Sequence, residues 1–534
     1  MRYGEYYEKP ISFNPTNIKE TLKLYKILES QCTKQLRDCP DSAVFEERRH
    51  YRRAIRVIEK KFNNNLRNIM KDNLLLLTDA YKQTHYRMLP PDTKYVYSYL
   101  ESRGVSDKGV PAETLMYGLQ ILLHRLQGSV FDMQDVEEAR VVCKSVFGMD
   151  IFNYQGWKDL YNKHHGSLPL RIEAVPEGTV VPSHNVLVTV ENTDPQFPWL
   201  VNFFETILLN GTWYPITVAT TSYGIKKLVR KWAEKTGGSM NVNFHLNDFG
   251  FRGVSSIESA GIGGSAHLIN FLGSDTLYGI TYAKKFYNAI DPIGLSVPAS
   301  EHSATITWGE GNEAEAYKHF MTQYPEGIIS IVADSYDLMN AINNIFGGEL
   351  KDLVINRNGK TVIRPDSGWP PIVSVQVAKA LYKIFGGETN DKGYITLNPK
   401  VGIIYGDFIK YGMIDDILTA MAEAGFSTDN IVFGMGGALL QQVNRDTFKF
   451  AFKTSAIQRG NEDWLAVSKH PATDPGKNSK AGRFQLLKEN DKFITVPYSE
   501  MKQDKDLLKT VFLNGVITKR YTFDEVRKTS EQYL

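Results

Sequence analysis

Four short apolar runs typical of β-strands recur in the second half of the chain, and each ends in acidic, arginine or glycine residues. The runs are Ile328–Ser335, Thr361–Gly368, Val401–Asp407 and Asn430–Gly437. Their starts lie 33, 40 and 29 residues apart, which leaves room for one helix and two loops in each interval. This spacing is typical of consecutive βα units with a parallel sheet, whose strands are buried on both faces.

The ends of these runs carry side chains suited to a phosphorylated ligand. In parallel α/β folds, the loops at the carboxyl ends of the strands form the ligand site. Arginine binds phosphate oxygens in pairs, carboxylates bind metal ions or ribose hydroxyls, and glycine lets backbone N–H groups approach an anion. The residues in these places are Asp334, Arg364, Asp366, Asp407, Gly436 and Gly437. The pattern therefore predicts an enzyme that acts on a phosphorylated sugar.

The rest of the chain divides into segments of different character. Two stripes at helical spacing, Asn17–Gln35 and Glu46–Met70, predict a helical hairpin extension over residues 1–70. Its second helix is rich in arginine and lysine, and we interpret this basic face as solvated rather than as a docking surface. Residues 71–195 and 456–534 are β-rich, with a short helix near Phe523, and residues 196–455 alternate between helix and strand.

The composition narrows the class of protein without identifying it. A length of 534 residues allows several structural units, and a net charge of +2 argues against binding nucleic acid over the whole surface. No apolar run approaches the roughly 18 residues of a membrane helix, and the first residues carry no apolar signal-peptide core. The three cysteines lack zinc-binding spacing and suit a reducing compartment. We expect a cytoplasmic enzyme that binds neither membrane nor nucleic acid.

Two familiar nucleotide motifs can be set aside. The chain has no Gly-x4-Gly-Lys-Ser/Thr loop. The segment Gly261–Ala266 matches a loose dinucleotide fingerprint, but no strand precedes it, and its small residues are better explained by close helix packing.

Five segments in order carry a family resemblance. They are Thr78–His85, Asn247–Ser256, Ser296–Ser303, Ile363–Gly368 and Phe433–Gly437. Together they closely resemble the nicotinamide phosphoribosyltransferases, a family of type II phosphoribosyltransferases, from about Asn73 to near the C-terminus. The resemblance implies an α/β fold: an irregular α/β barrel over residues 196–455, flanked by a β-rich domain made from residues 71–195 and 456–534. It also implies a homodimer whose active sites are shared between the two chains.

The resemblance implies a reaction of nicotinamide with phosphoribosyl diphosphate that gives nicotinamide mononucleotide and diphosphate. It further implies Mg²⁺ and ATP as a co-substrate that phosphorylates His302, with Glu301 beside it. Asp366 and Asp337 match positions that bind ribose or Mg²⁺. The positions that match phosphate or nucleotide contacts are Arg252, His302, Arg364, Gly406, Asp407, Gly436, Gly437, Arg445 and Lys453, with Arg103 and Lys469 as further cations.

Three residues match the family's site for the base. Phe249 corresponds to the aromatic residue that stacks on one face of the nicotinamide ring, and Tyr81 to the one that reaches the other face from the partner chain. Asp275 matches the carboxylate that accepts a hydrogen bond from the carboxamide. A carboxylate there attracts an amide donor and repels the carboxylate of nicotinate.

Two alternatives stay open at this point. A nicotinate phosphoribosyltransferase shares the fold and chemistry, and Asp275 is the residue against it. A non-catalytic interaction protein that uses the basic hairpin belongs to another class, and the intact charged set argues against it. Four positions depart from the family pattern, and we expect them to change affinities rather than the mechanism: Ala333, Phe408, Met435 and Trp369.

Overall fold

The computed structural model describes residues 72–534, except 107–109 and 474, together with isolated helical residues between positions 26 and 55. The chain forms two units, Met1–Leu77 and Thr78–Leu534. Most of the hairpin predicted for residues 1–70 lies outside the described residues. Within it, Glu29 accepts hydrogen bonds from Arg48 (3.0 Å) and Arg52 (2.9 Å). The second unit contains every predicted site residue.

Six parallel strands form one sheet of the second unit, in the spatial order β7-β6-β13-β12-β9-β8. All of its pairings are parallel. The four apolar runs are confirmed as the last four of its strands in chain order. The bounds are β6 Leu246–Asp248, β7 Gly273–Ser274, β8 Glu326–Val332, β9 Asn358–Arg364, β12 Val401–Tyr405 and β13 Ile431–Met435. Every residue of β12 is buried, as expected for a strand covered on both faces.

One irregular segment joins the two edges of this sheet. Leu295 pairs with Gly273 at the β7 edge, and Ala299 pairs with Ser330 at the β8 edge, both in parallel orientation. The segment between Leu295 and Ala299 therefore closes the sheet into the predicted irregular barrel. It leads directly to His302, so the closure places that residue at the barrel rim.

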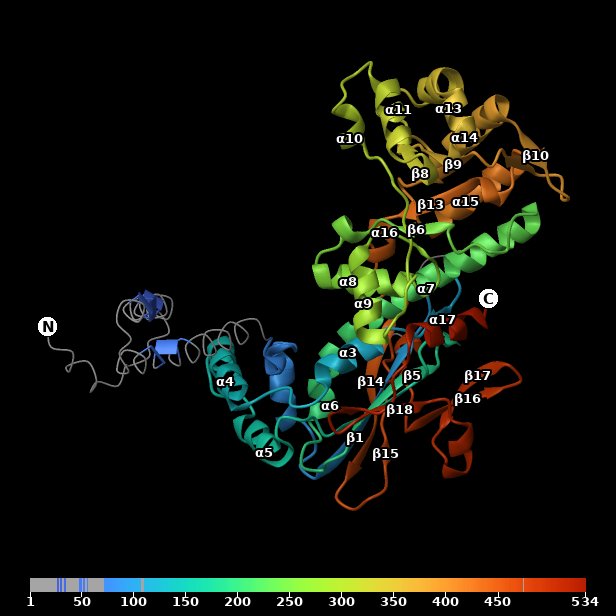
Figure 1. Cartoon of the computed structure of the whole chain (residues 1–534). Helices are drawn as coiled ribbons and strands as arrows, with labels where there is room; N and C mark the ends of the chain where they lie inside the picture. The colour runs from blue at the N-terminus through green and yellow to red at the C-terminus, as the bar shows by residue number, and fades with distance from the viewer. Residues whose placement is uncertain are drawn as a thin grey trace. The chain divides into compact units, whose positions relative to one another are not determined.

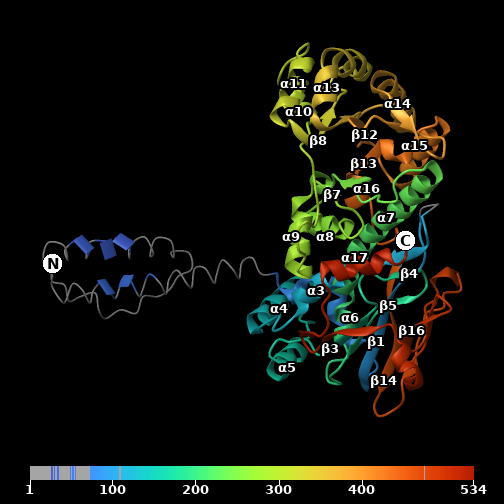
Figure 2. The same ribbon diagram turned by 45° about the vertical axis from the view of Figure 1, so that its right-hand side comes forward.

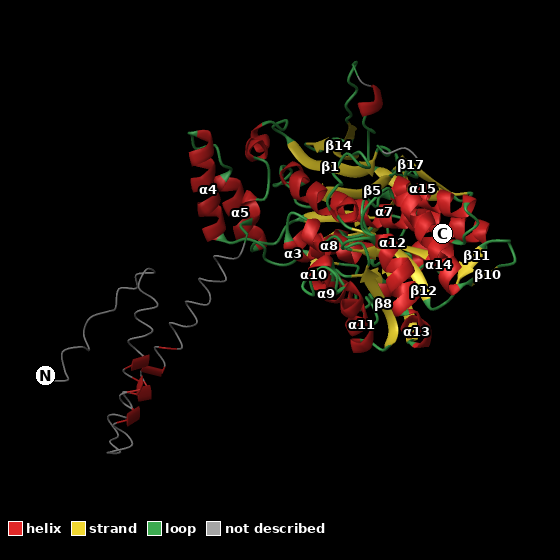
Figure 3. Cartoon of the chain, turned by 90° about the horizontal axis from the view of Figure 1, so that it is seen from above, coloured by secondary structure: helices red, strands yellow, loops and turns green. Residues whose placement is uncertain are grey.

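Helices alternate with the parallel strands and pack against them (Figure 3). The main ones are α7 Glu205–Thr236, α8 Ile257–His267, α9 Leu277–Tyr287, α11 Glu313–Gln323, α14 Pro370–Phe385 and α15 Tyr411–Glu423. Glycines let α8 and α9 approach closely: a Cβ on Gly264 would lie 3.1 Å from Cα of Gly279. The glycine-rich run in α8 thus serves helix packing.

A seven-stranded sheet is built from both ends of the second unit, in the order β15-β14-β1-β5-β3-β18-β19. Its bounds are β1 Thr93–Ser102, β3 Leu170–Ala174, β5 Val186–Asn192, β14 Phe450–Arg459, β15 Leu465–Ala466, β18 Lys509–Leu513 and β19 Val516–Ile517. Figures 1 and 2 show this sheet at the bottom of the unit, the parallel sheet at the top and the long helix α7 between them. Strand β14 spans the domain boundary predicted at residue 455.

Three helices lie within the segment predicted as β-rich, α3 Leu119–Leu126, α4 Met133–Phe147 and α5 Tyr154–His164. Among the described residues, no helix has the length and apolar character needed to cross a bilayer. The remaining elements are η2 Leu74–Leu76, η3 Ala80–Arg87, β2 Glu113–Leu115, β4 Val180–Pro182, α6 Leu200–Phe203, η4 Phe251–Gly253, α10 His302–Ile306, α12 Leu338–Asn340, η5 Ala341–Glu349, α13 Lys351–Asn356, β10 Gly387–Thr389, β11 Ile395–Leu397, η6 Thr428–Asn430, α16 Gly437–Leu440, η7 Pro475–Lys477, β16 Phe484–Glu489, β17 Lys492–Pro497, η8 Glu500–Lys505 and α17 Phe523–Glu531.

Candidate active site

His302, at the start of α10, is held by the buried carboxylate that follows β8. Nε2 of His302 lies 3.0 Å from Oδ1 of Asp334, whose side chain is 5% exposed. The other oxygen, Oδ2, accepts hydrogen bonds from the backbone N–H of Asp366 (3.0 Å) and the hydroxyl of Ser367 (2.5 Å). Because a carboxylate only accepts, Nε2 of the neutral imidazole carries the proton and Nδ1 keeps its lone pair. Asp334 therefore fixes both the orientation and the tautomer of His302.

The end of β9 and the loop after it bring an arginine and a carboxylate together beside this pair. Arg364 donates to Oδ1 of Asp366 from Nη2 (2.8 Å) and from Nε (3.2 Å). A Cβ on Gly406 would lie 3.2 Å from Nη2 of Arg364, so the glycine leaves room for the ion pair. Burial raises the pKa of Asp407, and the negative charges of Asp366 and Asp334 raise it further. The carboxylates at three neighbouring strand ends thus lie close enough to repel one another.

Phe249 follows β6 and is fixed by the neighbouring strand β13. Its backbone N–H donates to the carbonyl of Met435 (3.0 Å), and the guanidinium of Arg364 lies 5.4 Å from its ring centroid. A Cβ on Gly434 would lie 2.0 Å from the ring, so only a glycine at this position leaves enough space for the ring. The half-buried ring therefore presents one face beside the Arg364–Asp366 pair.

Asp275 is bonded to the residue before Phe249 and is oriented by the barrel-closing segment. Its backbone N–H donates to the carbonyl of Asp248 (2.9 Å), and its exposed carboxylate accepts a short hydrogen bond from Ser296. Asp248 itself is fully buried and accepts from the N–H of Gly250 (2.7 Å). Burial raises the pKa of Asp248 to about 6. A carboxylate oriented by one hydroxyl donor keeps capacity to accept a second donor from a ligand.

The remaining barrel residues line the same rim. Arg252 is largely exposed, with Nη1 3.8 Å from Oε2 of Glu301. Gly253 packs against Gly437, since a Cβ at Gly253 would lie 3.5 Å from the Cα of Gly437. Gly436 precedes α16, and Asp337 caps α12 by accepting from the N–H of Asn340 (2.9 Å). The carboxylate of Asp337 therefore already has a structural role as the cap of α12.

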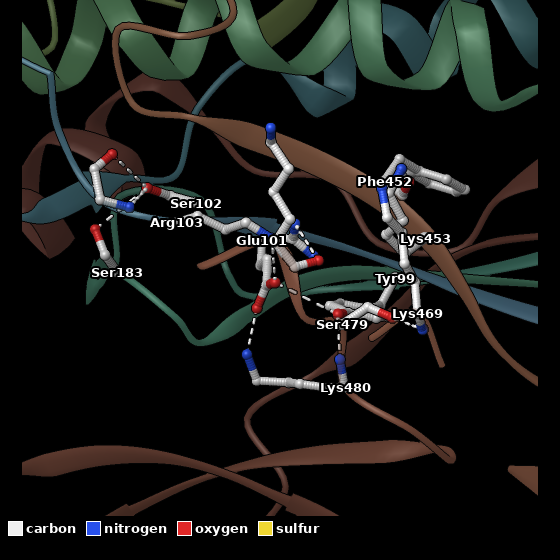
Figure 4. Close-up of polar contacts among 12 residues, drawn as sticks. Tyr99, Glu101, Ser102, Arg103, Ser183, Phe452, Lys453, Lys469, Ser479 and Lys480 are labelled. Atoms are coloured by element: carbon white, nitrogen blue, oxygen red, sulfur yellow. Dashed lines mark hydrogen bonds and ion pairs between the residues drawn. The ribbon is translucent and has the colours of Figure 1, made fainter. Parts of the chain in front are cut away.

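A second set of predicted residues lies on the seven-stranded sheet. In Figure 4, Arg103 and Lys480 both reach Glu101 on β1, and Lys453 projects from β14. Lys469 is tied to the same loop as Lys480, through paired hydrogen bonds with Ser479. Burial lowers the pKa of Lys453, and the positive charges of Arg103, Lys469 and Lys82 lower it further, against an opposite effect of Glu205. These residues form one basic cluster.

Tyr81 belongs to this second set. It lies on η3, where Lys82 forms an ion pair with Glu205 (2.6 Å) at the start of α7. Its side chain is 58% exposed, and its ring packs on His85 of the same helix at 5.3 Å. Arg445 is in the loop before β14 and donates to Asp446. Within the described part of one chain, no hydrogen bond, ion pair or ring contact joins Tyr81 to Phe249, and Figures 1 and 2 show β1 and β14 far from β8.

A Mg²⁺ ion suits the carboxylates of the barrel rim. The described residues contain no group of three or more His, Cys, Asp or Glu side chains that could hold a metal alone. Mg²⁺, however, is commonly bound by one or two carboxylates together with substrate phosphates. The mutual repulsion of Asp366, Asp334 and Asp407 fits a site that gains from a bound cation.

The sequence did not indicate several residues that the structure brings into the site. Asp334 was itself predicted as a strand-end acid, but the sequence did not indicate its bond to His302, which joins segments 32 residues apart. Ser296 and Gly434 act through contacts with Asp275 and Phe249 that no spacing in the sequence reveals. Glu301, expected beside the His302 imidazole, instead faces Arg252.

Comparison with known proteins identifies relatives over most of the chain. A model of the nicotinate phosphoribosyltransferase family matches residues 244–516, and a model of the nicotinamide phosphoribosyltransferase N-terminal domain matches residues 73–172. A nicotinamide phosphoribosyltransferase of Xanthomonas campestris is 43% identical over 470 residues, covering 85% of this chain and 97% of the relative. Another, of Acinetobacter baylyi, is 33% identical, covering 86% and 98%. The solved nicotinate-nucleotide pyrophosphorylase of Pyrococcus furiosus shares the fold, with a TM-score of 0.55, 16% identity and coverage of 86% and 95%.

Proposed function

Because this chain belongs to the nicotinamide phosphoribosyltransferase family, we propose that it joins nicotinamide to phosphoribosyl diphosphate in NAD salvage. The products are nicotinamide mononucleotide and diphosphate. The observation that carries this choice of base is the exposed Asp275 carboxylate, whose residue is bonded through its backbone N–H to Asp248, the residue before Phe249. Phe249 stacks on the pyridine ring, and Asp275 accepts a hydrogen bond from the carboxamide.

The reacting carbon develops positive charge as diphosphate leaves, so the site must stabilise both groups. Arg252 and Arg364 bind the leaving diphosphate through their guanidinium groups. Bound Mg²⁺, held by Asp366 with Asp407 or Asp337 nearby, would neutralise charge on the diphosphate oxygens. Asp366 and Asp407 face the ribose, and the backbone at Gly406, Gly436 and Gly437 leaves room for the nucleotide. The nicotinamide nitrogen then attacks the anomeric carbon from the opposite side.

ATP is proposed as a co-substrate that phosphorylates His302. The lone pair on Nδ1 attacks the γ-phosphorus, the bond to the β–γ bridging oxygen breaks, and ADP leaves with that electron pair. The proton on Nε2 stays in its hydrogen bond to Asp334, which stabilises the charge that the imidazole gains. Water later cleaves the N–P bond to release phosphate. The support is the tautomer set by Asp334, because it leaves the attacking nitrogen free.

A homodimer with shared sites explains the two separate sets of residues. The first set holds the base, the diphosphate and His302 on the barrel. The second set, with Tyr81, Lys453, Arg103, Lys469 and Arg445, carries an exposed aromatic ring and excess positive charge. In a two-fold dimer, this face of one chain completes the barrel site of its partner.

The decisive experiment measures the choice between the two bases. Purified protein with phosphoribosyl diphosphate and Mg²⁺ is given nicotinamide or nicotinate, and the product is separated by chromatography. We expect nicotinamide to be used about a hundredfold better, since repulsion of a second carboxylate by Asp275 costs ~3 kcal/mol. Asp275→Ser should narrow this difference. Equal use of both bases by the unmodified protein would reject nicotinamide as the specific substrate.

A further inference from the structure

Glu101 is a buried carboxylate at the centre of the basic cluster on the seven-stranded sheet. It is 2% exposed and accepts hydrogen bonds from Nε of Arg103 (2.9 Å) and from the ammonium group of Lys480. The hydroxyl of Tyr99 lies 3.4 Å from it and accepts from the backbone N–H of Lys480 (2.9 Å). Figure 4 shows these side chains converging on one point between β1 and the loop that carries Lys480.

The strand pairing explains why these groups share one face. Side chains two residues apart on a strand point to the same side, which aligns Tyr99 with Glu101. Tyr99 is directly opposite Lys453 in the antiparallel pairing of β1 with β14, so Lys453 projects from that side as well. The loop between Lys469 and Ser479 is closed by two hydrogen bonds, Ser479 N–H to the Lys469 carbonyl (3.0 Å) and Lys469 N–H to the Ser479 hydroxyl (2.8 Å).

The described part of the cluster carries a net positive charge and has an unused donor. Its cations outnumber its acids: Lys82, Arg103, Lys453, Lys469 and Lys480 stand against Glu101 and Glu205. Nη2 of Arg103 is buried and has no hydrogen-bond partner among the described residues. A buried guanidinium N–H without an acceptor is costly unless a ligand supplies one. Both features indicate that the cluster binds an anion with several oxygen atoms.

We propose that Glu101 is a positioning residue for this anion site. Its Oε1 holds Arg103 by Nε, which leaves Nη2 for a phosphoryl oxygen, and its Oε2 tethers the Lys469–Lys480 loop to β1 through Lys480. The anion is the phosphate monoester of the nucleotide bound in the partner chain's barrel. Glu101 has this role only if the proposed function is right, since the phosphate belongs to that reaction's substrate and product.

The test compares a ligand that carries the phosphate with one that lacks it. Titration calorimetry on the full-length protein measures the affinity for nicotinamide mononucleotide and for nicotinamide riboside. Glu101→Gln keeps the size of the side chain but removes its charge. We expect the affinity for the mononucleotide to fall about tenfold, because Arg103 and Lys480 lose their anchor, while the affinity for the riboside stays the same.

Glu191 provides a matched control on the same sheet. It is 12% exposed and is likewise bonded to two arginines, Arg171 (2.9 Å) and Arg483 (3.1 Å). Glu191→Gln should leave the ratio of the two affinities unchanged. If Glu101→Gln does not fold, Lys480→Met breaks the same tether at a side chain that is 29% exposed, and we expect the same selective loss.

The outcomes separate this role from the proposed function. Lys453→Met removes a cation of the site directly. If Lys453→Met weakens mononucleotide binding but Glu101→Gln does not, Glu101 is not a positioning residue and the anion site stands. If Glu101→Gln weakens both ligands equally, its role is general structural support. If neither variant affects the mononucleotide, the cluster does not bind the nucleotide phosphate, and the shared site of the proposed function fails with it.

Discussion

At the scale of single residues, Asp334 determines the orientation and the tautomer of the His302 imidazole. The carboxylate accepts three hydrogen bonds, and only one of them comes from the imidazole. The other two tie Asp334 to the loop after β9, which carries Asp366. The orientation of His302 and the position of the loop that we propose binds the ribose therefore depend on the same buried side chain. This link makes Asp334 a better target for mutation than the exposed Glu301.

Asp334→Asn should slow the phosphorylation of His302. An asparagine amide turns a donor either toward Nε2–H or toward the Asp366 N–H, so at least one present bond is lost. A charge-assisted hydrogen bond contributes about 1.5–3 kcal/mol, which corresponds to roughly 10- to 100-fold in rate. The measurement is the incorporation of acid-labile label from γ-labelled ATP, with Asp352→Asn on the exposed face of α13 as control. Phosphorus NMR should place the phosphate on Nδ1; a phosphate on Nε2 would contradict the tautomer assigned here.

Asp248 should make stability depend on pH. Its pKa is raised to about 6 in the folded chain, against an ordinary value of 3.8, because it is buried. The folded state therefore holds a proton that the unfolded state has released between these values. Stability from this group is full below about pH 4 and is lost, at about 1.4 kcal/mol per pH unit, as the pH rises toward 6. Asp248→Asn should remove this loss.

The measurement for Asp248 is the difference in melting temperature between variant and wild type from pH 4 to pH 8. We expect the difference to shift in favour of Asp248→Asn between about pH 4 and pH 6 and to stay level above that range. A difference that stays constant across this range would show that Asp248 titrates normally in the folded chain.

At the scale of elements, strand β13 determines the position of the Phe249 ring, which we propose stacks on the base. Gly434 leaves the space that Phe249 occupies, and a Cβ there would lie 2.0 Å from the ring. Gly434→Ala should turn the ring aside with little effect on melting temperature, because the atom that must move is the end of a side chain. Loss of stacking is worth roughly 1–3 kcal/mol, so the KM for nicotinamide should rise about tenfold.

The neighbouring strand β12 supplies the control for this change. A Cβ on Gly402 would meet only the side chain of Lys360, at 3.5 Å, which is an ordinary contact. Gly402→Ala should therefore be tolerated with the KM unchanged. An unchanged KM in Gly434→Ala as well would mean that Phe249 does not stack on the base.

The sequence predicted those elements in which burial alone produces a recognisable run of apolar residues. β8, β9, β12 and β13 are apolar runs that are buried wholly in β12 and over part of their length in the other three, and they were found with their spacing and order. Helix α3 was missed because its eight residues form a short apolar run, which periodicity cannot tell from a strand. The barrel-closing segment from Leu295 to Ala299 was missed because isolated bridges leave no pattern in the sequence. Site residues on strand ends were predictable, whereas partners such as Ser296 depend on tertiary contacts.

At the scale of the whole molecule, the site residues of one chain fall into two sets on different sheets. Phe249, Asp275 and His302 lie on the barrel rim, whereas Tyr81 and Lys453 lie with the seven-stranded sheet. The ion pair between Lys82 and Glu205 fixes η3, which carries Tyr81, to α7, and the charges of both groups act on Lys453 of the basic cluster. Tyr81 and the cations of the basic cluster would therefore enter the partner's site together. In a two-fold dimer, each chain makes this contribution to the site of the other.

This arrangement predicts complementation between two inactive variants. Tyr81→Ala and Phe249→Ala homodimers should both be weak, because every site lacks one stacking face. When the two are co-expressed, half of the dimers are mixed; in each mixed dimer one site has lost both aromatics and the other retains both, so about a quarter of all sites should be intact. Activity should rise to about that fraction of the wild type, with mixed dimers verified by differential tags. If activity stays at the level of the separate variants although mixed dimers form, Tyr81 acts within its own chain or not at all, and the two sets of residues do not meet across the interface.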